Sequence, residues 1–155
     1  MTPLFKKLNF KQQKEICILN PPAEFETELN AVKDYAAIKT NIDETNELEF
    51  VLAFVKTQTD IDTLTPLIDK KLKGDGIVWY AYPKGTSKKY KAAINRDNGW
   101  DILGKADFEP VRQVAIDEDW SALRFRKVEF IKVMTRRTDF AMTQQGQLKT
   151  KSAKP

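Results

Sequence analysis

Three runs of apolar residues stand out in the chain because no polar residue interrupts them. They are Ile16–Leu19, Phe50–Val55 and Ile77–Tyr82. A strand with one face in water alternates apolar and polar residues, whereas a strand buried on both faces carries a continuous apolar run. We therefore expect three strands in the interior of a sheet.

The interval after the first run has the periodicity of a helix. Phe25, Leu29 and Val32 recur at spacings of four and three residues, and the acidic residues of this segment lie near its start, where the helix dipole favours them. This pattern predicts a helix of about three turns that begins near Ala23. Residues 35–40 that follow it are read as a short further strand.

The interval after the second run predicts another helix, with Thr59 as its expected N-cap and Gly74 as its expected end. Its apolar stripe consists of Ile61, Leu64, Leu67, Ile68 and Leu72. Pro66 lies inside the stripe and lacks an amide donor, so we expect it to kink this helix or to delay its start.

The rest of the chain predicts a helix over Ile94–Ala106, then a hairpin of two strands, Phe108–Ile116 and Trp120–Val128, with an acidic turn. Strands that alternate with helices predict a parallel sheet covered on both faces. The expected fold class is therefore α/β: a single three-layer, open, mostly parallel sheet with helices on both faces and a C-terminal antiparallel hairpin.

Length and composition suit one compact domain. The 155 residues are 41% hydrophobic, and domains of this size bury roughly 70% of the surface of the unfolded chain. We expect a basic N-terminal arm over residues 1–14, the α/β domain over residues 15–134, and a basic, flexible tail over residues 135–155.

No apolar stretch reaches the ~20 residues of a membrane span, which predicts a cytoplasmic protein without a membrane partner. Cys17, the only cysteine, is expected to be a buried hydrophobe.

The chain contains no histidine. Nucleophile pairs that depend on histidine, His-rich zinc sites and four-thiolate sites are therefore excluded. A general base would have to be a carboxylate, lysine or tyrosine with a shifted pKa, and no motif indicates one. We expect no catalytic residue, no cofactor and no metal, and the sequence favours a protein that is not an enzyme.

The net charge of +4 is unevenly distributed. Residues 84–105 carry six basic and two acidic side chains, and residues 124–155 carry nine and two. Such clusters suit either a small anionic ligand or nucleic acid, and they also occur as solubilising surface. A homo-oligomer stays open as well, because a short sheet exposes an edge that a second copy could cover.

Two stretches resemble a known fold family. The stretches are LKGDGIVWYAYPK (residues 72–84) and ADFEPVRQVAIDEDWSALRFRKVE (residues 106–129). Together with the strand and helix before them, they resemble the second half of the Rossmann-like S-adenosylmethionine-dependent methyltransferases, although Asp107-Phe108 replaces the glycine-phenylalanine step of that family. The residues Gly76–Trp79, Pro83-Lys84 and Asp119–Ser121 also resemble a bacterial family known only as a domain of unknown function. The resemblance implies a shortened methyltransferase-like fold.

The cofactor motif of those methyltransferases is absent. A glycine-rich turn after the first strand lets the backbone approach a cofactor closely, but here Asn20-Pro21-Pro22 follows that strand and no glycine precedes Gly74. The glycines near Gly74 come before a strand rather than after one, and Lys84–Lys88 lacks the spacing of a P-loop. We expect no binding of S-adenosylmethionine in the usual mode.

A candidate site follows from position alone, because ligands of open parallel sheets bind beyond the carboxyl ends of the strands. Amides, hydroxyls and lysines gather there and suit an anion such as phosphate or carboxylate. The candidates are Asn20, Thr57, Gln58, Lys84, Thr86, Ser87, Lys88 and Lys89. A solvated loop that turns at Gly85 is the alternative.

Aromatic residues leave a choice between burial and recognition. Tyr80 and Tyr82 share one face of their strand and Trp79 takes the other, which favours burial over base stacking. Trp100 and Trp120 either complete the core or line a pocket. Three functions stay open: a non-catalytic binding or interaction module, a nucleic-acid-associated protein that uses its basic termini, and an atypical or degenerate methyltransferase.

Overall fold

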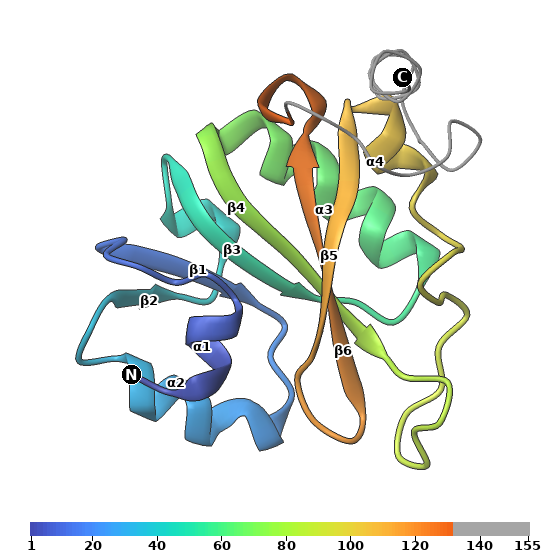
Figure 1. The fold of residues 1–155 in the computed structure, drawn as a ribbon, viewed down its shortest axis with the longest axis horizontal. Coiled ribbons are helices and arrows are strands. Elements are labelled where there is room, and N and C mark those ends of the chain that lie inside the picture. Colours follow the sequence, from blue (N-terminus) through green and yellow to red (C-terminus); the bar gives the residue numbers. More distant parts are fainter. Residues whose placement is uncertain (132–155) are drawn as a thin grey trace, which may run out of the picture.

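The computed structural model describes residues 1–131, which form one six-stranded sheet in the order β2-β1-β3-β4-β6-β5 (Figure 1). The strands are β1 (Glu15–Leu19), β2 (Ala37–Lys39), β3 (Leu48–Phe54), β4 (Leu72–Pro83), β5 (Phe108–Ala115) and β6 (Trp120–Lys127). Strands β1 to β4 pair in parallel, and β6 pairs antiparallel with both β4 and β5. The predicted fold class is confirmed, including the C-terminal hairpin.

Helices cover both faces of the sheet (Figure 1). Helices α1 (Pro3–Lys7) and α2 (Glu26–Val32) pack on the face that contains Trp79, while α3 (Gln58–Lys71) and α4 (Asp101–Lys105) pack on the face that contains Tyr80 and Tyr82. Short 3-10 turns lie at Ala23–Phe25, Ile42–Glu44 and Val128–Phe130. The continuous apolar runs are thus buried on both sides, as predicted, and Trp79, Trp100 and Trp120 all belong to the core.

The N-terminal segment is part of the same core. Phe5 is fully buried, with its ring centroid 6.3 Å from that of Phe50 on β3. The indole nitrogen of Trp79 on β4 donates a 2.8 Å hydrogen bond to the carbonyl of Leu8. These contacts hold α1 against the strands, while Lys6 and Lys7 on the same helix stay exposed.

Helix α3 begins earlier than expected. Thr57, not Thr59, is the N-cap: its hydroxyl accepts from the amide of Asp60 at 3.1 Å, and the Asp60 carboxylate accepts in return from the amides of Thr57 and Lys56. This reciprocal capping box satisfies donors that the helix itself leaves unpaired. The expectation that Pro66 delays the start is therefore wrong, and the helix runs past that residue to Lys71.

The end of α3 also differs from the expectation. The helix ends at Lys71, and β4 begins at Leu72, before Gly74. Position 76 requires glycine because β3 lies close to it: a Cβ there would lie 2.8 Å from the carbonyl oxygen of Leu48. The two glycines in this stretch thus serve the start of β4, and Gly74 takes the left-handed conformation at φ 54°.

The predicted helix over Ile94–Ala106 is wrong for its first seven residues. Helix α4 covers only Asp101–Lys105, and residues 95–98 form a turn closed by a pair of hydrogen bonds between Asn95 and Asn98. Gly99 takes φ 108°, a conformation that a right-handed helix does not contain. The predicted tail, residues 135–155, lies outside the described residues.

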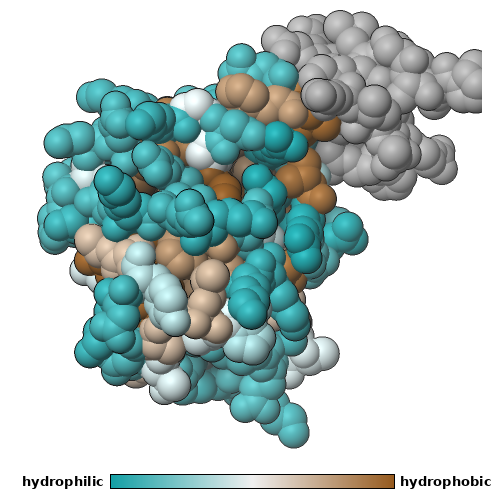
Figure 2. All heavy atoms as spheres, turned by 60° about the vertical axis from the view of Figure 1, so that its left-hand side comes forward, coloured by the Kyte–Doolittle hydropathy of each residue, from teal (hydrophilic) through white to brown (hydrophobic). Residues whose placement is uncertain are grey.

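The outer edge of β2 has no neighbouring strand among residues 1–131. The strand has three residues, and Tyr35 just before it is 55% exposed. Figure 2, turned toward this side of the molecule, shows a mainly hydrophilic surface crossed by a narrow apolar band. An edge this short offers few backbone groups for pairing. None of the helices in residues 1–131 has the length and hydropathy that a membrane span requires.

Candidate functional site

The carboxyl ends of three neighbouring strands meet at one edge of the sheet. β1, β3 and β4 are parallel and adjacent, so the residues after Leu19, Phe54 and Pro83 lie at that edge. Residues 84–100, which we call the edge loop, connect the end of β4 to α4. The fold thus brings all the predicted site residues to one edge, in three separate segments.

The first half of the edge loop is fastened to the turn between β5 and β6. The amide of Lys84 donates to the carbonyl of Asp119 at 2.8 Å, and the Ser87 hydroxyl donates to the Asp119 carboxylate at 2.8 Å. The same hydroxyl accepts from the amide of Tyr90 at 3.0 Å. Ser87 therefore organises the loop with its own bonds.

Tyr90 then reaches across the edge. Its hydroxyl donates a 2.7 Å hydrogen bond to the carboxylate of Glu24, in the turn after β1, and its ring centroid lies 5.0 Å from that of Trp120. The ammonium of Lys56, just after β3, stands 4.7 Å from the centroid of the Tyr90 ring. We call Glu24, Lys56, Lys89, Tyr90 and Trp120 the Tyr90 cluster. It ties the ends of β1 and β3 to the loop after β4.

Electrostatics in the Tyr90 cluster favour an ionised Glu24. The hydrogen bond from Tyr90, with smaller contributions from Lys89 and the Trp120 indole, lowers the pKa of Glu24 to about 2. Lys89 lies 3.3 Å from the same carboxylate. The carboxylate in turn raises the pKa of Lys89 and of Tyr90, chiefly through the hydrogen bonds that each donates to it. At neutral pH Glu24 is thus a carboxylate, Lys89 an ammonium and Tyr90 a neutral phenol.

Several predicted site residues already have structural partners. Thr57 caps α3, and the Gln58 amide donates to the carbonyl of Gly99 at 3.1 Å and to Asp62 at 3.2 Å. Ser87 binds Asp119 and Lys89 binds Glu24, as described above. Asn20 is exposed, in the left-handed conformation at φ 54°. A bound anion would have to compete with these contacts.

The remaining predicted residues are Lys84, Thr86 and Lys88. Among residues 1–131, the side chains of Lys84 and Lys88 have no carboxylate within 4 Å, and the same holds for Lys91 and Arg96 of the edge loop, which were not predicted as site residues. Thr86 lies between the first two and is exposed. The outer side of the edge loop is therefore basic, and an anion would bind there with the least competition.

Sequence reasoning did not anticipate the roles of Glu24, Lys56 and Tyr90. Glu24 has the signature of an acid at a helix start, and Tyr90 is one aromatic residue in a lysine-rich loop. Sixty-six positions separate the two residues, and no local pattern relates them.

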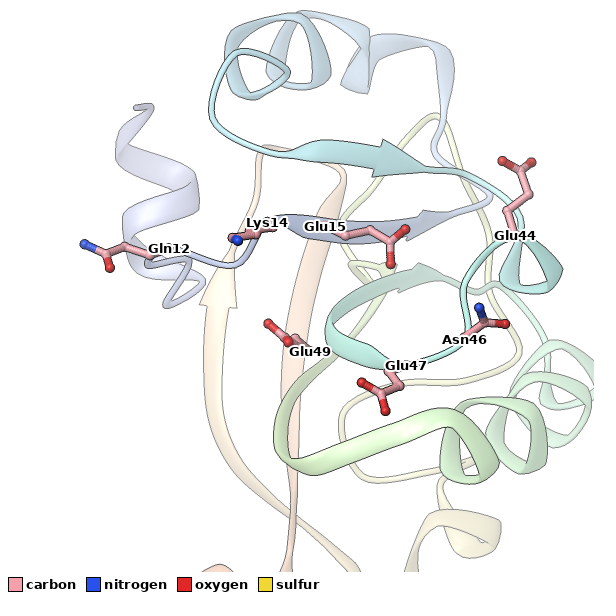
Figure 3. A pocket seen from close by; sticks show the side chains of 7 residues that line it. All are labelled: Gln12, Lys14, Glu15, Glu44, Asn46, Glu47 and Glu49. Atoms are coloured by element: carbon pink, nitrogen blue, oxygen red, sulfur yellow. The ribbon is translucent and has the colours of Figure 1, made fainter.

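A hollow of about 700 Å³ lies at the opposite edge, where β1 and β3 begin (Figure 3). It is lined by Gln12, Lys14, Glu15, Glu44, Asn46, Glu47 and Glu49. Glu15 accepts a 2.7 Å hydrogen bond from the Thr45 hydroxyl, and Lys73 lies 3.4 Å from Glu47 and 3.5 Å from Glu49. Within residues 1–131, no three acidic or cysteine side chains are placed to share a metal ion. Glu47 and Glu49 thus share an ion pair with Lys73, and Glu15 is hydrogen-bonded to Thr45.

The comparisons with known proteins concern the fold. No family model matches the chain, and no curated protein matches it in sequence. A putative type 11 methyltransferase from Sulfolobus solfataricus matches in structure with a TM-score of 0.51 and 12% identity, over 81% of this chain and 89% of that one.

Two further solved structures match less well. The fibrillarin pre-rRNA processing protein of Methanococcus jannaschii gives a TM-score of 0.49 with 11% identity, over 76% of this chain and 67% of that one. The N-methyltransferase NodS of Bradyrhizobium japonicum gives 0.48 with 16% identity, over 75% and 85%. Identities this low establish fold and no more. The described part of the chain has a methyltransferase-like α/β fold.

Proposed function

We propose that the protein is a non-catalytic binding or interaction module that keeps a methyltransferase-like fold without its cofactor. The Tyr90 cluster is the observation that carries this proposal. In open parallel sheets the ligand lies beyond the carboxyl ends of the strands, and here Tyr90 contacts both Glu24 and Lys56 across that space.

The turn after β1 supports the same conclusion. Pro21 and Pro22 have no amide hydrogens, so they cannot donate to a cofactor. A side chain at every position of this turn also keeps the backbone away from a ligand, unlike a glycine-rich turn.

Calorimetric titration with S-adenosylmethionine and S-adenosylhomocysteine tests this proposal. We expect no binding heat at millimolar ligand. The comparison should include Tyr90→Ala, which opens the edge and leaves Pro21 and Pro22 in place. Saturable binding by the unmodified protein would overturn the proposal and would favour the atypical methyltransferase, the candidate that the fold likeness supports.

An anionic partner is the ligand class that we propose for the edge loop. Lys84 and Lys88 carry charges without an ion pair within residues 1–131, and Thr86 adds a hydroxyl between them. Because the backbone amides of Ser87, Lys89 and Tyr90 bind within the loop, recognition would depend on side chains. Contacts of that kind attract anions in general and discriminate little between one anion and another.

Nucleic acid is the second candidate, favoured by the charges of Lys84, Lys88, Lys91 and Arg96, which have no ion pair within residues 1–131. Binding of a fluorescent single-stranded oligonucleotide should weaken steeply with salt, because binding releases counterions. The triple variant Lys84→Gln, Lys88→Gln, Lys91→Gln should reduce the salt slope, whereas Lys33→Gln, an exposed lysine on another element, should not. Equal binding by both variants would remove the edge loop from this proposal, and deletion of residues 135–155 would then test the tail.

A further inference from the structure

Two arginines face each other across the C-terminal hairpin. In the register of β5 and β6, Arg112 lies opposite Arg124, and a β-bulge between Pro110 and Arg112 sets this pairing. Without the extra residue, Val111 would oppose Arg124 and Arg112 would point to the other face of the sheet. Directly opposed like charges destabilise a strand pair, so the bulge creates an arrangement that the fold alone does not favour.

Neither arginine has an ion-pair partner in the described part of the chain. No carboxylate lies within 4 Å of Arg112 or Arg124, and the Nε of Arg124 is buried without a hydrogen-bond partner. Arg126, two residues further along β6 on the same face, does have an ion-pair partner. Its guanidinium donates from Nε at 3.0 Å and from Nη2 at 2.6 Å to the two oxygens of Asp75.

The surroundings of Arg124 are unfavourable for its charge. Burial, followed by repulsion from Arg126 and Arg112, lowers the pKa of Arg124, and Asp75 compensates only in part. A guanidinium stays ionised in proteins. Arg124 therefore carries a positive charge that lies half-buried beside a second one, with a donor that no described group accepts.

We propose that Arg112 and Arg124 form a binding site for a phosphate group that carries two negative charges. Two guanidiniums offer forked donors that match phosphate oxygens in pairs. A phosphomonoester or free phosphate near neutral pH carries about two charges and neutralises both arginines, whereas a carboxylate or a phosphodiester neutralises one. This site lies on a face of the sheet, apart from the edge loop, and does not rest on the function proposed above.

Inorganic phosphate is the probe, and melting temperature and calorimetric titration are the measurements. At constant ionic strength, phosphate should raise the melting temperature of the unmodified full-length protein. In Arg112→Gln and in the volume-conserving Arg124→Met, that rise should be lost. Without phosphate, Arg112→Gln should melt at the same or a higher temperature than the unmodified protein, because the repulsion is gone. That comparison separates loss of a site from loss of the fold.

A matched control assigns the binding to one place. The double variant Lys84→Gln, Lys88→Gln changes the edge loop and should keep the part of the phosphate response that Arg112→Gln removes. If this variant loses the response and Arg112→Gln keeps it, phosphate binds at the edge loop, and the arginine site is wrong while the proposed function gains support. The absence of any phosphate response in the unmodified protein would also overturn the arginine site.

The charge of the ligand gives an independent test. Inorganic phosphate changes from a dianion to a monoanion at about pH 7, roughly one unit above a phosphomonoester, so its affinity should fall several-fold between about pH 8 and about pH 5. Dimethyl phosphate, a monoanion throughout this range, should bind more weakly than inorganic phosphate at the higher pH and show no such change. Equal affinity for the two compounds would contradict a site built for two charges.

Discussion

The hydroxyl of Tyr90 and the carboxylate of Glu24 form a 2.7 Å hydrogen bond that joins the loop after β4 to the turn after β1. Both residues lie at the surface, and their bond crosses the edge where folds of this architecture bind ligands. Because Trp120 and Lys56 pack on the same ring, Tyr90 holds four segments of the chain together. Its removal should therefore affect the mobility of the edge loop more than the stability of the sheet.

Tyr90→Phe tests that bond alone, since the ring and its contacts remain. We expect faster hydrogen exchange at the amides of residues 84–93 and a small decrease in the urea midpoint. Exchange in β3 and β4 should not change. Thr86→Ala, in the same loop at an exposed position, is the control and should leave exchange as it is. Unchanged exchange in Tyr90→Phe would contradict the anchoring role.

Acid should weaken the Tyr90 cluster in a defined range of pH. The folded protein lowers the pKa of Glu24 from 4.5 to about 2. Its ionised carboxylate therefore contributes stability above about pH 4.5, and this contribution is lost as the pH falls toward about 2. The difference in urea midpoint between the unmodified protein and Glu24→Gln should shrink across that range. A difference that stays constant with pH would contradict the ionic role of Glu24.

A buried hydroxyl pair offers a sharper energetic test. The Thr65 hydroxyl donates to the carbonyl of Ile61 at 2.8 Å, so the Tyr80 hydroxyl, 2.7 Å away, must donate to Thr65. Thr65→Val leaves the Tyr80 hydroxyl buried without a partner, which should cost about 1–3 kcal/mol of unfolding free energy. Burial also raises the pKa of Tyr80, which accords with the dry surroundings.

The double variant Thr65→Val, Tyr80→Phe is the matched control, because it removes both hydroxyls. Its unfolding free energy should lie closer to that of the unmodified protein than the value for Thr65→Val alone. If chemical denaturation gave a loss of unfolding free energy in the double variant equal to the sum of the losses in the two single variants, the two hydroxyls would not interact.

Two glycines of the edge loop should respond differently to alanine. A Cβ at Gly99 would lie 2.6 Å from a methyl group of Ile94, and its φ is 108°, so Gly99→Ala should destabilise by more than about 1 kcal/mol. A Cβ at Gly85 meets no atom within 4 Å, so Gly85→Ala should be neutral or stabilise by about 0.4–1 kcal/mol. Thermal denaturation of the pair measures both. Equal effects would contradict the conformation of residues 94–100.

The strands followed from the sequence because their burial is continuous. Ile16–Leu19, Phe50–Val55 and Ile77–Tyr82 carry the signal of two covered faces, and the order of elements then implied a parallel sheet. The helix expected over Ile94–Ala106 failed because Ile94 packs against Gly99 in a turn. The contact between Ile94 and Gly99 holds this glycine at a positive φ. In such a short segment, that contact outweighs the apolar spacing that favours a helix.

The sites were harder to predict because distant residues compose them. The carboxyl edge was found through the direction of the strands, but the partner of Tyr90 lies 66 residues away and leaves no local pattern. The pair of Arg112 and Arg124 depends on the bulge after Pro110. A shift of one residue decides which side chains share a face, and sequence patterns do not fix boundaries that finely.

The hydrogen bond from the Trp79 indole to Leu8 spans 71 residues, and this span has a consequence for synthesis. Phe5 packs on Phe50 of β3, and Leu8 accepts from Trp79 of β4, so the contacts of α1 form only after the ribosome has made these strands. The docking of α1 is complete once β4 has been made. Until then the growing chain presents part of this apolar segment, which makes the segment a suitable target for a chaperone that meets the chain early.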